Sequence, residues 1–320
     1  EIARWSYGSR TTVTLPPFTA GVDAQWMRDD RQNYTPDRPQ LPPPRLTRDQ
    51  VERVSEVGPF IQSQLGLGGL ASLTVGARYD RVTFRVEDAF QSDGDDSGER
   101  VMAALSGSAG VVLDGVAFAR PYLNVATSFE TPTTTELANR PTGPGGFNPV
   151  LQPQKAVNYE LGVRGQVLDV GEYSVAAFQT EVEDELIPFE VPGDPGRRFF
   201  QNAGSARHRG AEASLTVRPR PSLTVLAAYT FSDFRFIEFR TATDTLDGRY
   251  LPGVPRHYLH WSVRYDGPLG LWLAADNTHA SGVYVNDVNT AAIRTTPWTA
   301  VGLRAGWNGQ VGAWLVSPFA

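Results

Sequence analysis

The segment Ser222–Ser232, with the sequence SLTVLAAYTFS, decides the fold because its residues alternate in character with a period of two. In an extended strand, successive side chains point to opposite faces, so every second residue shares a face. One face of this segment carries apolar and aromatic side chains, at Leu223, Val225, Ala227, Tyr229 and Phe231. The other face carries serine, threonine and alanine, with Leu226 as the apolar exception. A strand with one apolar and one polar face separates two different media.

The same alternation recurs along the chain, and helical periodicity is almost absent. Residues 72–80, 211–218 and 256–265 each place mainly apolar side chains on one face and mainly polar or charged side chains on the other. A period of two that is repeated in so many segments predicts β-strands. We therefore predict an all-β, antiparallel fold.

Composition narrows the class of protein further. The longest apolar run, Ala109–Ala119, is interrupted by Asp114 and falls well short of the roughly 18 residues that a membrane-spanning helix needs. A spanning β-strand needs only about 9–11 residues and turns half of them toward a polar lumen. The low mean hydropathy of −0.29 is therefore compatible with a membrane protein. The sequence contains 0 cysteines, which excludes disulfides, and a net charge of −6 without a basic block, which argues against nucleic acid as a partner.

The connections between the predicted strands favour one architecture. Fourteen strands are predicted, at residues 4–14, 18–34, 49–65, 70–90, 99–113, 117–129, 155–168, 172–189, 197–218, 222–240, 256–265, 271–284, 296–307 and 311–316. Their links alternate between short turns, such as 114–115 and 219–221, and long segments rich in proline and glycine, such as 130–154 and 241–255. Outer-membrane barrels have this asymmetry, with tight periplasmic turns and longer outer loops. We predict that residues 1–320 form one domain, which is part of an antiparallel transmembrane β-barrel.

Aromatic residues often end the apolar faces near these links. They are Tyr79, Phe129, Tyr159, Phe231, Tyr265, Trp298 and Trp307. Rings at these positions suit the aromatic girdles that mark the two membrane interfaces of a barrel. The alternative is ordinary β-propensity, because aromatic residues favour any strand.

Four stretches resemble the C-terminal barrel region of TonB-dependent receptors. They are residues 126–133 (ATSFETPT), residues 148–164 with NP, LQPQK and NYELGVR, residues 201–212 with QNAG and RGAE, and residues 250–257 (YLPGVPRH). The resemblance covers the chain from about residue 18 onward, and its second and third stretches are the more specific. Members of the family usually carry glutamate where Gln154 stands, which is a minor departure.

The resemblance implies a barrel of about 22 strands with an N-terminal plug in its lumen. The implied activity is active import of a scarce nutrient across the bacterial outer membrane, energised through a TonB box by the TonB–ExbB–ExbD complex. A ferric siderophore is the default substrate, and cobalamin, haem and oligosaccharides remain open. Iron would enter only as the transported chelate, so no resident cofactor is expected. The chain has no recognisable plug or TonB box and too few strands, so we expect the plug, the first strands and the last strand or strands to be missing from it.

Two groups of site residues follow from this expectation. Residues on the polar faces of their strands would line the lumen and contact the plug, namely Glu160, Arg164, Glu212, Ser214 and Arg218. Residues of the outer loops and upper lumen would contact the substrate, namely Arg140, Phe147, Arg197, Arg198, Phe199, Arg249 and Tyr250. Arginine suits anionic ferric chelates, and aromatic rings suit planar groups. The alternative for the first group is that any wide barrel lines its lumen with charges, and for the second that exposed arginines and rings are common in loops.

Catalysis and resident metal binding are not expected. His257 and His260 are three residues apart, which in a strand puts them on opposite faces. No serine–histidine–aspartate grouping, phosphate-binding glycine loop or paired carboxylates stand out, so the sequence does not predict an enzyme. Three other functions remain open. They are a passive outer-membrane porin, an adhesin or structural barrel, and a soluble β-rich domain that binds or hydrolyses carbohydrate.

Overall fold

A long antiparallel sheet dominates the computed structural model, which describes residues 1–35, 43–92, 94–115, 118–137, 140–141, 147–148, 150–189, 199–202, 204–241 and 244–320. The sheet has 13 strands, and they follow one another in chain order. The strands are β1 (Ile2–Leu15), β2 (Phe18–Tyr34), β3 (Leu46–Leu67), β4 (Ala71–Asp88), β5 (Gly98–Leu113), β6 (Arg120–Glu130), β7 (Gln154–Val167), β8 (Gly171–Glu183), β11 (Ser205–Arg220), β12 (Leu223–Glu238), β13 (His257–Asp266), β14 (Leu271–Ala280) and β15 (Trp298–Trp307).

Two small hairpins and a short helix complete the described elements. They are β9 (Leu186–Phe189) paired with β10 (Phe199–Asn202), β16 (Gly309–Val311) paired with β17 (Trp314–Val316), α1 (Thr134–Leu137), and the 3-10 turns Pro268–Gly270 and Ala291–Ile293. Within the described ranges, no helix has the length and apolar character needed to cross a membrane.

The structure confirms the all-β antiparallel fold and corrects three of the predicted strands. Residues 172–189 were expected as one strand, but β8 ends at Glu183 and Asp184 adopts a φ of 57°, so β9 leaves the main sheet. Residues 197–218 divide in the same way into β10 and β11. Residues 311–316 do not form a fourteenth strand of the sheet, because β16 and β17 pair only with each other.

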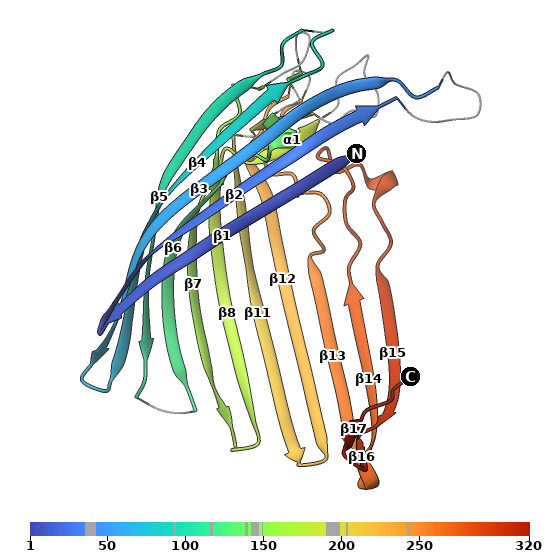
Figure 1. The fold of residues 1–320 in the computed structure, drawn as a ribbon. Helices are drawn as coiled ribbons and strands as arrows, with labels where there is room; N and C mark the ends of the chain where they lie inside the picture. The colour runs from blue at the N-terminus through green and yellow to red at the C-terminus, as the bar shows by residue number, and fades with distance from the viewer. Residues whose placement is uncertain are drawn as a thin grey trace.

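The sheet curves around a hollow, with α1 and the long connections at its upper end and short turns at its lower end (Figure 1). Strands β1 and β15 are the two edges of the sheet, and among the described residues they do not pair with each other, so the barrel is not closed in this chain. The alternation of short and long links therefore places the two kinds of connection at opposite ends, as the sequence predicts.

The register keeps the two faces of the sheet chemically distinct across all its strands. On β12, Ala228 pairs with Ser214 of β11 and with His260 of β13, so the polar rows of the three strands share one face. The opposite, convex face carries the apolar rows, and its large side chains stay exposed, for example Leu161 at 62% and Leu303 at 78%. In the described part of the chain, no second sheet covers this face. An apolar face of this extent is typical of a surface in contact with lipid.

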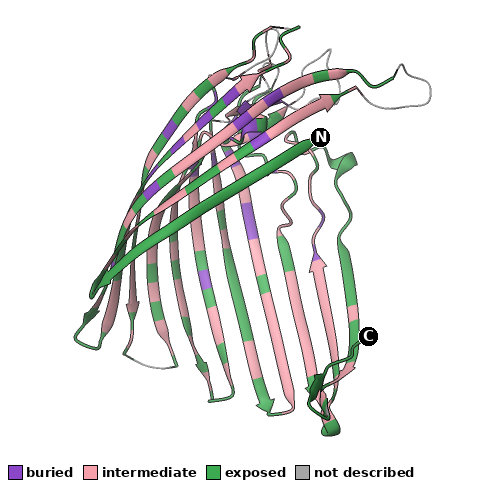
Figure 2. Ribbon diagram, in the orientation of Figure 1, coloured by how far each residue is buried: buried purple, intermediate pink, exposed green. Residues whose placement is uncertain are grey.

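Buried residues concentrate toward the upper ends of the strands, on the concave side, where the connections fold against the sheet (Figure 2). One apolar cluster joins strands β8, β11 and β12 to their connections, through Val182, Ile187, Ala206, Phe236, Phe239, Leu246 and Leu251. The other joins β4 and β5 to α1 and its flanking segment, through Val82, Phe84, Met102, Leu137 and Leu151. The hairpin β9–β10 contributes to both clusters, because Ile187 belongs to the first and Leu186 and Phe200 pack against the second.

Candidate functional site

The concave wall of β1 to β4 carries a network of arginines and carboxylates. Asp23 on β2 accepts hydrogen bonds from Arg10 Nε on β1 and from Arg78 Nη1 on β4, each at 2.5 Å. Arg78 also donates from Nε to Asp80 at 2.6 Å and from Nη2 to Glu56 at 3.5 Å. These contacts between arginines and carboxylates are charge-assisted hydrogen bonds. They are stronger than hydrogen bonds between neutral groups, and they fix the orientation of each side chain.

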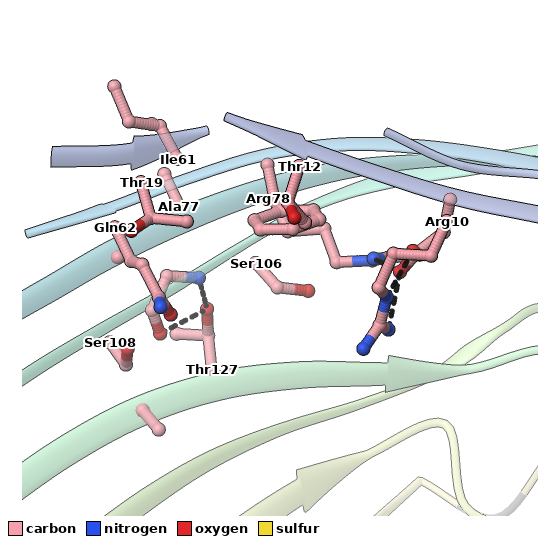
Figure 3. Close-up of a pocket in the computed structure, with 15 residues that line it drawn as sticks. Arg10, Thr12, Thr19, Ile61, Gln62, Ala77, Arg78, Ser106, Ser108 and Thr127 are labelled. Carbon is pink, nitrogen blue, oxygen red and sulfur yellow. Dashed lines mark hydrogen bonds and ion pairs between the residues drawn. The ribbon is translucent and has the colours of Figure 1, made fainter. Parts of the chain in front are cut away.

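A groove of about 470 Å³ runs beside this network on the sheet wall (Figure 3). Its lining includes the hydroxyl-bearing residues Thr12, Thr19, Ser106 and Ser108, together with Gln62 and the ring of Phe60. Charged groups at one end and hydroxyl groups along the lining give the groove many hydrogen-bond donors and acceptors. A polar polypeptide segment or a hydrated ligand would find hydrogen-bond partners on this surface.

The same wall contains two acidic side chains that are almost completely buried. Asp29 is 2% exposed and receives two hydrogen bonds from Arg4, at 2.7 and 2.6 Å. Glu52 is 1% exposed and lies 3.3 Å from Nη1 of Arg31. A buried carboxylate is costly unless it is paired, so these arginines are needed to keep the two acids in place. The local sequence pattern does not indicate these pairs, because only the register of β1 to β3 brings the residues together.

Of the residues predicted to line the lumen, Glu160, Arg164, Glu212 and Ser214 lie on the concave face. Tyr122 of β6 donates from its hydroxyl to Glu160 at 2.6 Å, and the guanidinium of Arg164 lies 5.7 Å from the centre of the Tyr122 ring. Arg164 and Ser214 also line a common cavity of about 370 Å³. Glu212 is exposed on the same face of β11, and Arg218 is exposed at the register irregularity that follows Val217. Their contact with a plug stays a prediction.

The residues predicted to contact the substrate are distributed over several environments. Arg140 donates from Nε and Nη2 to the carbonyl of Phe147, at 3.2 and 3.0 Å, so the structure brings these two residues together. Phe147 packs against the second apolar cluster, and Phe199 is 3% exposed with its ring 6.0 Å from that of Phe189. These two rings therefore stabilise the loops in this structure. Arg197 and Arg198 lie outside the described residues.

Arg249 and Tyr250 fall on opposite faces of the wall. The backbone of this segment pairs with β12, with Tyr250 opposite Arg235 and with Leu251 N bonded to the carbonyl of Phe234. Leu251 belongs to the concave apolar cluster, so Arg249 shares its face and Tyr250 points to the convex side. The side chain of Arg249 is exposed on the concave side. That either residue binds substrate stays a prediction.

A buried acidic group sits between β8 and β9 at the upper end of the concave side. Burial, with a smaller contribution from the charge of Asp287, raises the pKa of Glu185 to about 7. Burial also raises the pKa of Asp287. Glu185 Oε2 has no hydrogen-bond partner among the described residues, and Oε1 lies 3.8 Å from Nε2 of His208. Unlike Asp29 and Glu52, these carboxyl groups have no arginine partner in the described chain, so burial is not offset and their pKa values rise.

Within the described ranges, no three histidine, cysteine, aspartate or glutamate side chains lie together in a way that could hold a metal ion. The arrangement is a polar wall with fixed ion pairs, covered at its upper end by apolar clusters.

Comparison with known proteins identifies the family. The model of the TonB dependent receptor-like β-barrel family matches residues 3–316. The ferrioxamine B receptors of two Salmonella typhimurium strains are 25% identical over 247 residues, which cover 77% of this chain and 32% of each receptor. The chain therefore spans about a third of the length of these curated relatives.

Solved structures share the fold at lower identity. The siderophore receptor PiuA from Acinetobacter baumannii superposes with a TM-score of 0.75 and 16% identity, over 97% of this chain and 50% of that one. The ferric yersiniabactin uptake receptor FyuA from Yersinia pestis gives 0.72 and 17%, over 100% of this chain and 52% of the other. The family's members are transport receptors of the bacterial outer membrane. Because the family model covers nearly the whole chain, the protein belongs to the TonB-dependent receptors, and these residues are part of their β-barrel in the outer membrane.

Proposed function

We propose that this barrel belongs to an energy-coupled importer that carries a ferric siderophore across the outer membrane, with TonB, ExbB and ExbD as the source of energy. Iron is then cargo, bound in its chelate, and the barrel has no resident cofactor. Ferrioxamine B, preacinetobactin and yersiniabactin receptors among the similar proteins support a siderophore over other nutrients. A copper transporter is also among the proteins of similar fold, so the metal of the cargo can differ between proteins with this fold.

The main support for the proposal is that loops cover the upper end of the concave face. The segments around α1, the hairpin β9–β10 and residues 244–254 pack on this face in two apolar clusters. A passive porin relies on a polar lumen that stays open to water. Apolar clusters across the entrance instead favour a receptor whose path opens only when the wall and its contents rearrange.

The lumen wall supports the same proposal. Arg10, Asp23 and Arg78 form a paired network beside a groove of about 470 Å³ that is rich in hydroxyl groups. A plug domain that filled the lumen would find in this groove donors and acceptors for its own polar surface. Among the predicted substrate contacts, Arg249 is exposed on the concave side, and its charge suits an anionic chelate.

Uptake in cells tests the proposal. The full-length gene is deleted, and accumulation of iron-55 is measured with hydroxamate, catecholate and carboxylate siderophores in iron-limited medium. We expect the deletion to abolish uptake of one class, and loss of TonB to abolish the same uptake. Unchanged uptake of every chelate would contradict the siderophore assignment. Uptake that needs the gene but not TonB would favour a passive channel.

A further inference from the structure

The loops that cover the upper end of the concave face form two halves, each built around one of the apolar clusters. The first half joins the upper ends of β8, β11 and β12 to residues 244–254. The second half joins β4 and β5 to α1 and Leu151. Among the described residues, the hairpin β9–β10 is the only element with side chains in both clusters, with Ile187 in the first and Leu186 and Phe200 in the second.

The side chain of Asn202, at the end of β10, is bonded to two other segments of the chain. Its Nδ2 donates to the carbonyl of Gln152 at 2.9 Å and to the carbonyl of Asp184 at 2.6 Å. Its Oδ1 accepts from the backbone N–H of Gln152 at 2.8 Å. These bonds use both donors of the amide and fix the direction in which it faces. Asn202 therefore binds the backbone of Gln152 as a neighbouring strand does, through one donor and one acceptor.

This contact fastens the hairpin β9–β10 to the second half. Gln152 directly follows Leu151, which is 1% exposed in the second cluster. A further bond runs in the same place, from the backbone N–H of Leu186 to Oε1 of Gln154 at 3.2 Å. Asn202 belongs to the stretch QNAG and Gln152 to the stretch LQPQK, and these stretches carry the most specific family resemblance. The structure joins the two stretches at this point.

A second asparagine makes the same kind of contact, but within the first half alone. Asn289, in the connection between β14 and β15, accepts with Oδ1 from the backbone N–H of Tyr250 at 2.6 Å. Its Nδ2 donates to the carbonyl of Tyr250 at 2.8 Å. Tyr250 directly precedes Leu251, which belongs to the first cluster. The two asparagines therefore form a matched pair, of which only Asn202 connects the hairpin to the second half.

We propose that Asn202 is a positioning residue that couples the two halves of the cover, so that they open and close together when the cargo enters. Apolar contacts are non-directional, whereas the paired hydrogen bonds to Gln152 allow a single position of the hairpin. Segments that are joined in this way open as one cooperative unit. The uptake experiment below rests on the proposed function, and the hydrogen-exchange experiment rests on the fold alone.

Hydrogen exchange of the purified full-length receptor, without ligand, tests the coupling. The amides that report are those of Leu251 in the first half, Asn148 in the second half and Ile187 in the hairpin, all of which are bonded to backbone carbonyls. Asn202→Ala should raise the frequency of opening about tenfold at all three amides, because several hydrogen bonds are lost together. Asn202→Asp keeps the size of the side chain but loses both donors, and it should have a similar effect.

Asn289→Gly is the matched control, because glycine accepts the φ of 56° at this position and only the contact with Tyr250 is lost. This variant should raise opening at Leu251 and leave Asn148 unchanged. The proposal would be overturned if Asn202→Ala gave the same pattern as Asn289→Gly, or if it left the amides of both halves unchanged.

Asp184→Gly separates the coupling from a local effect on the corner where β8 ends. Asn202 also bonds the carbonyl of Asp184, whose φ of 57° is unfavourable for residues other than glycine. If Asn202 only supported this corner, adding Asp184→Gly to Asn202→Ala would restore slow exchange in both halves, and the proposal would be wrong. We expect the amide of Asn148 to remain open in the double variant, because the link to Gln152 is still missing.

Uptake in cells gives the functional readout. At equal receptor levels, Asn202→Ala should raise the half-saturating concentration for iron-55 uptake about tenfold and leave the maximal rate unchanged, because the cover holds the cargo and TonB drives the later step. Asn289→Gly should raise it less. A change in the maximal rate alone would contradict the proposed role of Asn202. If the unaltered receptor imports no ferric chelate, siderophore import is wrong, and the exchange results decide the coupling by themselves.

Discussion

Arg78 on β4 reaches across β3 to Asp23 on β2, with 2.5 Å between Nη1 and Oδ2, and it passes over Gly58. A β-carbon at position 58 would lie 2.1 Å from Arg78 Nη2 and 2.4 Å from Asp80 Oδ1. Because glycine at position 58 has no side chain, Arg78 and Asp23 form an ion pair across β3 although their own strands are not neighbours. The pair ties three strands together on the lumen side.

We predict that Gly58→Ala displaces Arg78 from Asp23 and lowers the urea concentration at which the full-length barrel unfolds in detergent. The flexible end of the arginine moves more easily than the backbone, so the barrel should still assemble. Arg53→Gln is the control, because Arg53 pairs with Glu87 on the exposed convex side at 2.7 Å, where ion pairs contribute little. A shift for Arg53→Gln as large as that for Gly58→Ala would contradict the importance of the lumen network.

A second prediction compares two adjacent alanines on β12. Ala227 belongs to the convex apolar row, and Ala228 faces the lumen opposite Ser214. Arginine on the lipid-facing side near the middle of the membrane costs about 2–4 kcal/mol, whereas arginine in a polar lumen meets water. Ala227→Arg should therefore lower the free energy of unfolding by about this amount, and Ala228→Arg by less than about 1 kcal/mol. Equal losses in a reversible folding measurement in lipid vesicles would contradict the assignment of the two faces.

The fold could be predicted from the sequence wherever the local pattern determines it. The alternation in Ser222–Ser232 fixes the two faces of β12 without reference to any other strand, and the lengths of the links predict which end carries the loops. The end of β8 could not be predicted in this way, because apolar residues continue beyond Asp184 into β9. Asp184, with a φ of 57°, ends the pairing there. A positive φ is uncommon for residues other than glycine, so the sequence does not indicate it.

The site could be predicted only as far as the face of each residue. Alternation alone predicts that Glu160 and Arg164 share the polar face of their strand, and in the structure both lie on the concave side beside Tyr122. The ion pair between Arg78 and Asp23 depends on the register of three strands and on Gly58 between them. The sequence of a single strand does not contain this information. Phe199 was expected to contact the substrate, but in β10 it is 3% exposed, because the burial of a residue in these connections depends on how distant segments fold over it.

A third prediction tests contact with a plug. Glu212 is exposed on the concave face, Arg218 is exposed at the end of β11, and neither has an ion-pair partner among the described residues. Their removal should change the stability of the barrel by no more than about 0.5 kcal/mol. If they contact a plug, the double variant E212Q/R218Q of the full-length receptor should still bind the chelate at the cell surface but import it more slowly. Unchanged import at equal receptor levels would favour the alternative that these charges only hydrate the lumen.

The last prediction concerns pH and the hairpin β9–β10. The pKa of Glu185 is raised from 4.5 to about 7, so the folded hairpin holds a proton that the open form releases. Between these two values the folded form binds more protons than the open form, and its stability falls as the pH rises. Asp287 changes the stability in the same direction, because its pKa is also raised. Hydrogen exchange of the amides of Leu186, Ile187 and Phe189, corrected for the intrinsic rate, should show more frequent opening at pH 8 than at pH 5.

Glu185→Gln provides the control for that measurement, since the amide has a similar shape and does not ionise. This substitution should stabilise the hairpin at pH 8 and remove most of the pH dependence, while His208, whose Nε2 lies 3.8 Å from Glu185 Oε1, keeps its place on the ring of Phe234. A hairpin that opened less at pH 8 than at pH 5 would show that Glu185 is charged and paired in the folded receptor. The carboxyl group would then act as an anion at the entrance, and the neutral acid inferred from its burial would be wrong.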